Sequence, residues 1–148
     1  MAAAFQHVSP IVVETCEGMS SIRSVEDLED AFGVPLEHES HPMPNRHVKD
    51  QIDEWHTATF ADAEAGYLVS ETATRPIMVY HLRIHTKRSA FGAYQLIGKP
   101  AANALTLLGP PDAEAGNDLI YYCGEVNSIR LEVVDGGVSA IIWQPYAG

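Results

Sequence analysis

The sequence predicts an α+β fold in which two helix-then-three-strand repeats form an antiparallel sheet with the helices on one face. Two short segments with apolar residues at helical spacing each end in a Gly-x-Pro stop, FGVP at 32–35 and LGPP at 108–111. Segments with period-two alternation follow each stop, which is typical of strands with one buried face. A length of 148 residues is the common size of one domain. We therefore expect a single domain over 1–148, with pseudo-repeats at about 22–86 and 89–146.

The first expected helix begins after Ser24, a residue type that caps helix N-termini. Leu28 and Phe32 then lie on one face at helical spacing. Gly33 and Pro35 end the helix, because glycine tolerates the left-handed conformation at a helix C-terminus and proline cannot continue the hydrogen-bond ladder. The acidic side chains of this helix are expected to add electrostatic contacts at the rim of a binding face.

The next segment, LEHESHPMPN at 36–45, is polar and contains two prolines, so it is predicted to be a surface loop. Asn45 is a candidate N-cap for a second helix. The apolar residues that follow at helical spacing are Val48, Ile52 and Trp55.

Three antiparallel strands are expected after this helix. They are WHTATF at 55–60, YLVSETAT at 67–74 after an Ala-Gly turn, and IMVYHLRIHT at 77–86. Alternation in the third strand predicts an apolar face formed by Met78, Tyr80, Leu82 and Ile84. The opposite, largely polar face is expected to carry Val79, His81, Arg83 and His85.

The second half is expected to contain a helix and three more strands. KRSAFGAYQLIG at 87–98 is ambiguous and is a candidate for a short helix, whereas Pro100 favours the first turn of a helix that ends at Gly109. The three strands are LIYYCG at 119–124, SIRLEVV at 128–134 and VSAIIWQPY at 138–146. Asp135 and Gly136 between the last two predict a hairpin.

Composition limits the classes of partner. The chain has 9 basic and 20 acidic side chains and a net charge of −11, a field that repels phosphate backbones and anionic lipid surfaces. We therefore expect no nucleic-acid partner. No membrane partner is expected either, because no apolar run reaches the roughly 18 residues of a spanning helix. A basic protein partner would be attracted by this field.

The N-terminus and the cysteines bear on location. MAAAFQHVSPIVV lacks the basic start of a secretory signal, so a cytoplasmic location is expected. Cys16 and Cys123 are far apart in the sequence and are expected to be separate buried or incidental thiols. The alternative is a single bridge that ties the N-terminal segment to the sheet.

A family resemblance is carried by ALTLLGPPD at 104–112, the tyrosine-rich YYCG at 121–124 and IRLEVVDGGVSAIIWQPY at 129–146. Together they resemble the helix, L-G-x-P turn and three-strand unit of the β-lactamase-inhibitor-protein-like fold, which is built from tandem copies. The segments are also similar to small bacterial lipoproteins and toxin-neutralising immunity proteins. The first half resembles the unit in outline, with an insertion at 36–54. The resemblance implies a bacterial protein whose open sheet face grips another protein and blocks it.

Several side chains are candidates for contacts with such a partner. His81, Arg83 and His85 share the polar face of the strand at 77–86. Tyr121 and Tyr122 point to opposite faces, and Tyr122 is taken as the outward aromatic. The expected partner-binding residues are therefore His81, Arg83, His85, Tyr122, Glu37 and Glu39.

No metal or other cofactor is expected. His38, His41 and His47 have spacings that a zinc site can use, but no predicted element fixes their geometry, so a solvated acidic loop is the preferred interpretation. No dinucleotide, phosphate-loop, hydrolase or metalloprotease motif occurs.

The expected function is a non-enzymatic bacterial inhibitor or immunity-type protein that binds another protein, with basic character, through an exposed sheet face. One alternative is a small α+β cone or barrel around a ligand pocket, in which His81 or His85 acts as a base. Another is a secretion chaperone, which would form a tight dimer. The sequence leaves the oligomeric state open.

Overall fold

A computed structural model describes residues 9–45, 47–70, 77–86, 92–123 and 127–144. Across these ranges, eight strands form one antiparallel sheet in the order β1-β2-β3-β4-β8-β7-β6-β5, so β1 and β5 are its two edges. The expected α+β class is confirmed. The strands are β1 (Glu37–Pro44), β2 (Ile52–Thr59), β3 (Ala63–Val69), β4 (Met78–Ile84), β5 (Ala113–Ala115), β6 (Asp118–Tyr122), β7 (Ser128–Val134) and β8 (Gly137–Gln144).

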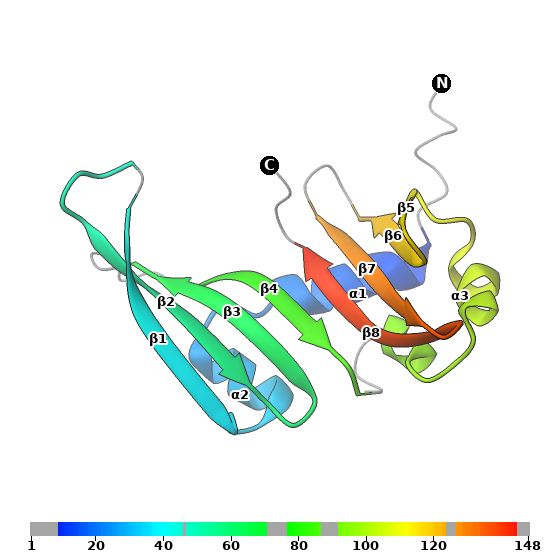
Figure 1. The fold of residues 1–148 in the computed structure, drawn as a ribbon, viewed down its shortest axis with the longest axis horizontal. Helices are drawn as coiled ribbons and strands as arrows, with labels where there is room; N and C mark the ends of the chain where they lie inside the picture. The colour runs from blue at the N-terminus through cyan, green and yellow to red at the C-terminus, as the bar shows by residue number, and fades with distance from the viewer. Residues whose placement is uncertain (1–8, 46, 71–76, 87–91, 124–126, 145–148) are drawn as a thin grey trace.

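The first two helices lie on one side of the sheet. Figure 1 shows α1 (Pro10–Ser20) and α2 (Val25–Phe32) behind it, and η2 (Gly92–Leu96, a 3-10 helix) and α3 (Ala101–Leu108) beside its second half. In the described ranges no helix is long and apolar enough to cross a bilayer. One sheet face is therefore covered by α1 and α2, and the other faces away from them.

The core lies between the sheet and these helices. Side chains with 0% or 1% exposure come from α1 (Met19), α2 (Leu28), β4 (Leu82) and β8 (Ile141). They belong to one buried cluster that draws on both halves of the chain. The two halves of the sheet thus share one core.

Helix α1 was not predicted from the sequence. Its first residue, Pro10, suits a first helical turn, and the Oγ of the preceding Ser9 accepts a hydrogen bond from the Ile11 N–H at 3.2 Å. Thr15 connects α1 to η2, because its Oγ1 accepts a hydrogen bond from the Ala93 N–H at 3.0 Å. The ambiguous segment at 87–98 does contain a short helix, η2.

The two eight-residue helices that were expected, α2 and α3, end in nearly the same backbone conformation. Gly33 has φ 86° and ψ −168°, and Gly109 has φ 85° and ψ −170°. Such positive φ values favour glycine. Four strands follow each helix in the described chain, not the three expected, because β1 and β5 were missed. That the halves are equivalent repeats stays a prediction.

The segment at 36–54 differs from the expectation. The predicted surface loop is the strand β1, all eight residues of which are exposed. Asn45 caps no helix. It closes a turn, because its Oδ1 accepts hydrogen bonds from the N–H groups of His47 and Val48, both at 2.8 Å. The chain then returns as β2 from Ile52, so the helix expected here is wrong.

The second expected strand begins earlier than predicted. Ala65 and Gly66, expected as a turn, lie within β3. The turn falls before them, where the Phe60 N–H donates to the Ala63 carbonyl at 2.7 Å. Part of this strand as predicted, residues 71–74, lies outside the described residues.

A β-bulge interrupts the alternation of β4. Gly66 pairs with His81, but the next residue, Tyr67, pairs with Val79, so Tyr80 is the extra residue. On the N-terminal side of the bulge, the side chains of β4 point to the face opposite the one that strict alternation predicts.

This exchange corrects the predicted faces of β4. Leu82 and Ile84 are buried as expected, both at 0% exposure. Met78 and Tyr80 were expected in the core, but they are 56% and 39% exposed. A single extra residue moves every side chain beyond it to the other face, which a strict period-two pattern does not reveal.

The expected hairpin between β7 and β8 is confirmed. Val134 pairs with Gly137, and the two residues between them, Asp135 and Gly136, have φ values of 52° and 77°. Positive φ at both central positions defines a type I′ turn, which Asp-Gly favours.

The two cysteines form a disulfide, so the expectation of separate thiols is wrong. Cys16 of α1 is bonded to Cys123, directly after β6, across a sequence separation of 107 residues and a Cα–Cα distance of 6.4 Å. This is the bridge from the N-terminal segment to the sheet that the sequence left as the alternative. Sequence spacing alone carries no information on such a distance.

Candidate protein-binding face

The side of the sheet that faces away from α1 and α2 is named the outer face. Directly paired residues of antiparallel strands lie on the same face, so the strand registers assign each side chain. Two neighbouring rows of paired residues cross the first half of the outer face, Glu39–Thr57–Gly66–His81 and Glu37–Thr59–Glu64–Arg83.

Four of the predicted partner-binding residues, Glu37, Glu39, His81 and Arg83, therefore lie on the outer face. A fifth, Tyr122, is 49% exposed, while the neighbouring Tyr121 is buried at 3%.

The predicted residues do not form one compact site. Six strand spacings separate β1 from β6, a distance of roughly 30 Å. His85 follows the end of β4, and its Nδ1 lies 3.3 Å from the Thr86 hydroxyl. The acidic helix α2 lies behind the sheet, so the expected contribution of that helix to the rim of the outer face is wrong (Figure 1).

An apolar and aromatic group occupies the outer face beside these rows. Trp55 pairs with Leu68, and Leu68 pairs with Met78. The Trp55 and Tyr80 rings stack with centroids 5.9 Å apart. We name Trp55, Leu68, Met78 and Tyr80 the aromatic patch. All four side chains are at least partly exposed, which is unusual for a cluster of large apolar residues.

Gly66 explains how the indole lies flat on the sheet. A Cβ atom at this position would stand 2.9 Å from Cζ2 of Trp55 and 3.5 Å from Cβ of His81. The ring thus occupies the space that a side chain at Gly66 would take. Glycine within β3 was the available sequence signal for this close approach, but Ala65 and Gly66 were predicted to form a turn.

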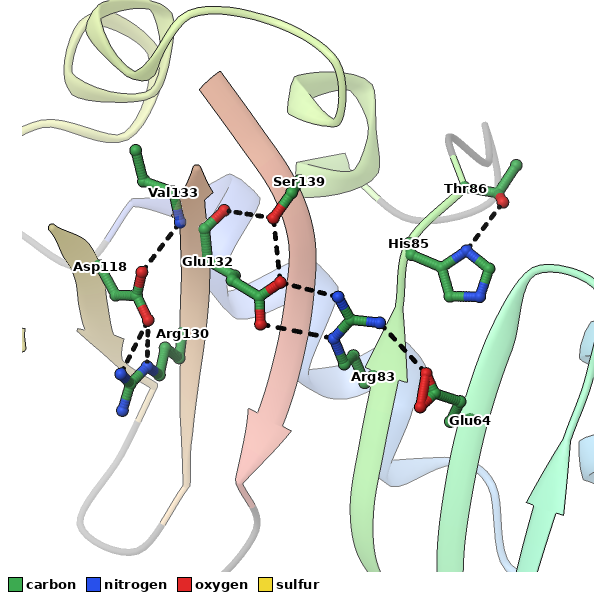
Figure 2. Close-up of polar contacts among 9 residues, drawn as sticks. All are labelled: Glu64, Arg83, His85, Thr86, Asp118, Arg130, Glu132, Val133 and Ser139. Atoms are coloured by element: carbon green, nitrogen blue, oxygen red, sulfur yellow. Dashed lines mark hydrogen bonds and ion pairs between the residues drawn. The ribbon is translucent and has the colours of Figure 1, made fainter. Parts of the chain in front are cut away.

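Arg83 is the centre of an ion-pair cluster where the two halves of the sheet meet. Figure 2 shows its guanidinium between Glu64 of β3 and Glu132 of β7. The Nη1–Oε2 distance to Glu64 is 3.1 Å and the Nη2–Oε1 distance to Glu132 is 2.7 Å. The Ser139 hydroxyl donates to the same Glu132 oxygen at 3.0 Å. Arg83 is therefore already paired with carboxylates of this chain.

The charges of this cluster stabilise one another. The hydrogen bond from Arg83 is the main cause that lowers the pKa of Glu132, and the Ser139 hydroxyl adds to it, while burial acts in the opposite direction. The hydrogen bond with Glu132 likewise raises the pKa of Arg83. The cluster fixes β4 and β7 across β8 rather than presenting a free cation to a partner.

A second ion pair occupies the other half of the outer face. Arg130 of β7 donates from Nε to Oδ2 of Asp118 in β6 at 2.7 Å, and the other oxygen of Asp118 accepts a hydrogen bond from the Val133 N–H at 2.9 Å (Figure 2). Arg130 and Asp118 are thus paired with each other within the chain.

Histidines also gather on the side of the sheet that carries the helices. His38 Nε2 lies 2.7 Å from His56 Nδ1, and His56 Nε2 lies 2.9 Å from a Glu54 carboxylate oxygen. The His56 ring stacks on Tyr67 at 4.9 Å. Burial raises the pKa of Tyr67, and the nearby charge of Glu29 on α2 adds to this shift. The arrangement is a hydrogen-bonded chain of two imidazoles and a carboxylate.

The three histidines whose spacing was weighed against a zinc site, His38, His41 and His47, do not form a metal-binding group in the described residues. His38 and His41 stand on opposite faces of β1, because they are three residues apart in a strand. Across the described ranges, no three His, Cys, Asp or Glu side chains are grouped closely enough to hold a metal ion.

The strands form an open sheet, so the expected alternative of a closed cone or barrel does not match the described fold. One open depression of about 420 Å³ lies at the far end of β1–β3 and is lined by Pro42, Ile52, Asp53, Glu54, Val69 and Ser70. The residues proposed as a base, His81 and His85, are not part of its lining.

No protein-family model matches the chain, and no curated protein or solved structure matches it either.

Proposed function

We propose that this chain is a non-enzymatic bacterial inhibitor or immunity-type protein that binds a basic protein through the outer face of β1–β4. The aromatic patch is the observation that carries the proposal. Trp and Tyr are favoured at the centre of protein interfaces, because they bury a large area with few rotatable bonds. Stacking of Trp55 on Tyr80 holds both rings in place before a partner arrives, which reduces the entropy lost on binding.

The charges around the aromatic patch support a basic partner. Glu37 and Glu39 are exposed on β1, in the two rows beside the patch. With a net charge of −11, the chain would also steer a cationic protein towards itself and accelerate association. An apolar centre with a polar rim is the usual anatomy of a protein interface, and acidic groups in that rim suit a basic partner.

The disulfide bears on where this binding takes place. Disulfides persist in oxidising compartments and are rare in the cytosol. The Cys16–Cys123 bond therefore favours a chain that works outside the cytoplasm, in place of the cytoplasmic location that the sequence predicts.

Affinity capture with paired variants tests the proposed function. Met78→Asp adds a carboxylate to the aromatic patch, and Val25→Asp adds one to α2 behind the sheet; the native side chains are 56% and 43% exposed. We expect a basic protein to be captured by the native chain and by Val25→Asp, and to be lost with Met78→Asp and with Trp55→Ala/Tyr80→Ala. Equal capture by all variants, or none by the native chain, would refute the proposal.

A further inference from the structure

The edge of the sheet at β1 is a second surface that can form backbone hydrogen bonds with a partner. Among the described strands β1 pairs with β2 alone, and each of its eight residues is exposed. An edge strand presents unpaired backbone N–H and C=O groups to one side. Such an edge can accept an additional strand.

The register shows which backbone groups point outwards. Pro44 pairs with Ile52, and one residue further along the Asn45 N–H donates to the Gln51 carbonyl at 2.9 Å. Backbone groups of alternate residues face opposite sides of an antiparallel strand. The odd-numbered residues of β1 therefore bond towards β2, and the even-numbered ones face away, namely His38, Ser40, Pro42 and Pro44.

Prolines restrict this edge to a short window. Proline has no N–H, so Pro42 and Pro44 offer no donor at the outward positions. Outward donors remain at His38 and Ser40. At the other end, the Leu36 N–H donates to the Thr59 carbonyl at 2.7 Å, so the outward row begins at His38. Pairing is thereby limited to the part of β1 that carries Glu37 and Glu39.

We infer that the edge of β1 over residues 37–41 binds an extended segment of the partner protein with Lys or Arg at alternate positions. The inference rests on the proposed function, since it names the chemistry of that partner. A strand added here would place every second side chain on the outer face, opposite Glu37 and Glu39, at the roughly 5 Å spacing of cross-strand neighbours. Opposite charges at this spacing stabilise the pair.

A second copy of this chain fits the edge less well. Antiparallel pairing of two β1 strands that centres on Glu39 would set carboxylate against carboxylate, which is destabilising. The short window also leaves few backbone bonds to offset this repulsion.

The test uses a fluorescent octapeptide in which Arg alternates with Thr, and measures its binding to the full chain by anisotropy. Ser40→Pro removes an outward donor, and we expect it to weaken binding about tenfold, the effect of one lost hydrogen bond at the upper end of the usual range. Glu37→Gln/Glu39→Gln should weaken binding roughly fivefold and reduce its dependence on salt. Pro42→Thr adds a donor at the next outward position and should strengthen binding.

Two controls separate strand addition from general charge attraction. Glu114→Gln removes a carboxylate at the opposite edge, in β5, and should leave the affinity unchanged. A peptide with N-methyl groups at alternate residues keeps its charge and should lose most of its affinity. Circular dichroism verifies that Ser40→Pro folds, and Pro42→Thr tests the same edge in the opposite direction.

The inference is overturned if the peptide does not bind, if Ser40→Pro and Pro42→Thr both bind as the native chain does, or if the N-methylated peptide binds equally well. It is also overturned if sedimentation shows a dimer that Ser40→Pro abolishes, because the edge would then pair with a second copy. Trp55→Ala/Tyr80→Ala should not affect the peptide. Partner capture that survives Ser40→Pro but not Met78→Asp would leave the proposed function standing without this inference.

Discussion

The two halves of the sheet carry opposite kinds of outer face. In β1–β4 that face exposes the aromatic patch, and the edge strand β1 has no buried residue. In β5–β8 that face carries charged side chains that are paired within the chain, Arg130 with Asp118 and Glu132 with Arg83 of β4. The second half is also tied to α1 by the disulfide. The difference indicates that internal cross-links stabilise the second half, whereas the outer face of the first half is exposed and is the surface we propose for binding.

Removal of the Cys16–Cys123 disulfide should cause the largest loss of stability. We expect Cys16→Ala/Cys123→Ala to lower the free energy of unfolding by up to about 4.7 kcal/mol, the chain-entropy value for a loop of about 100 residues. Urea denaturation measures the loss, and hydrogen exchange should show it first in α1 and β6. A loss below about 1 kcal/mol, or one felt first in β1–β2, would contradict the idea that internal cross-links stabilise the second half.

A pair of truncations compares the two halves directly. Leu131 of β7 is 0% exposed and Met43 of β1 is 39% exposed. Leu131→Ala should cost about 3 kcal/mol through lost burial and the cavity left behind, whereas Met43→Ala should cost less than about 0.5 kcal/mol. Similar losses in the two variants, measured by chemical denaturation, would show that β1 is more tightly packed than its exposure indicates.

Arg83 tests the junction between the halves. Arg83→Gln should cost roughly 1 kcal/mol at pH 7, a modest value because the ion pairs are partly exposed to solvent, with side-chain exposures of 27% for Arg83 and 28% for Glu132. Denaturation at pH 7 measures this cost.

The same cluster predicts a dependence on pH. The pKa of Glu132 is lower in the folded chain than in the unfolded one, so its stabilisation is present above the unfolded pKa and is lost as the pH falls through the folded pKa. Glu132→Gln should therefore reduce the fall in unfolding free energy on acidification. If the unfolding free energy of that variant falls on acidification as much as that of the native chain, Glu132 does not contribute to the pH dependence.

A modest effect is expected from the hydrogen bond that ties Tyr121 of β6 to Gly109, directly after α3. The hydroxyl of Tyr121 donates to the Gly109 carbonyl at 2.8 Å, and burial, with a smaller contribution from Asp112, raises the pKa of Tyr121 to about 12. Tyr121→Phe should cost about 1 kcal/mol or less. The stabilisation is present below the unfolded pKa and is lost as the pH rises through about 12. Ultraviolet titration should show a late tyrosine step that disappears in Tyr121→Phe.

Local signals in the sequence predicted the elements that depend on local chemistry. Ser24 and Gly33 delimit α2 as expected, and Asp135 with Gly136 forms the expected hairpin. The edge strand β1 was missed, because a strand without a buried face shows no alternation. The exposure of Tyr80 was missed because it depends on a bulge.

The candidate site was predictable as a face but not as a set of contacts. Glu39 and His81 do share a row of the outer face, as alternation within each strand allows. The pairing of Arg83 with Glu132, 49 positions apart, and the disulfide across 107 positions depend on tertiary folding that no local pattern encodes. The aromatic patch arises from three strands and so escaped a reading of one strand at a time.

Fluorescence of Trp55 reports whether a partner covers the outer face of β1–β4. The chain has two tryptophans, and Trp143 is buried at 5% exposure, so Trp143→Phe leaves Trp55 as the only indole. Acrylamide should quench Trp55 readily in the free chain. Addition of the basic protein captured by the native chain should then protect Trp55 from the quencher. Quenching that stays unchanged when this protein is bound would contradict the assignment of the outer face of β1–β4 as the binding surface.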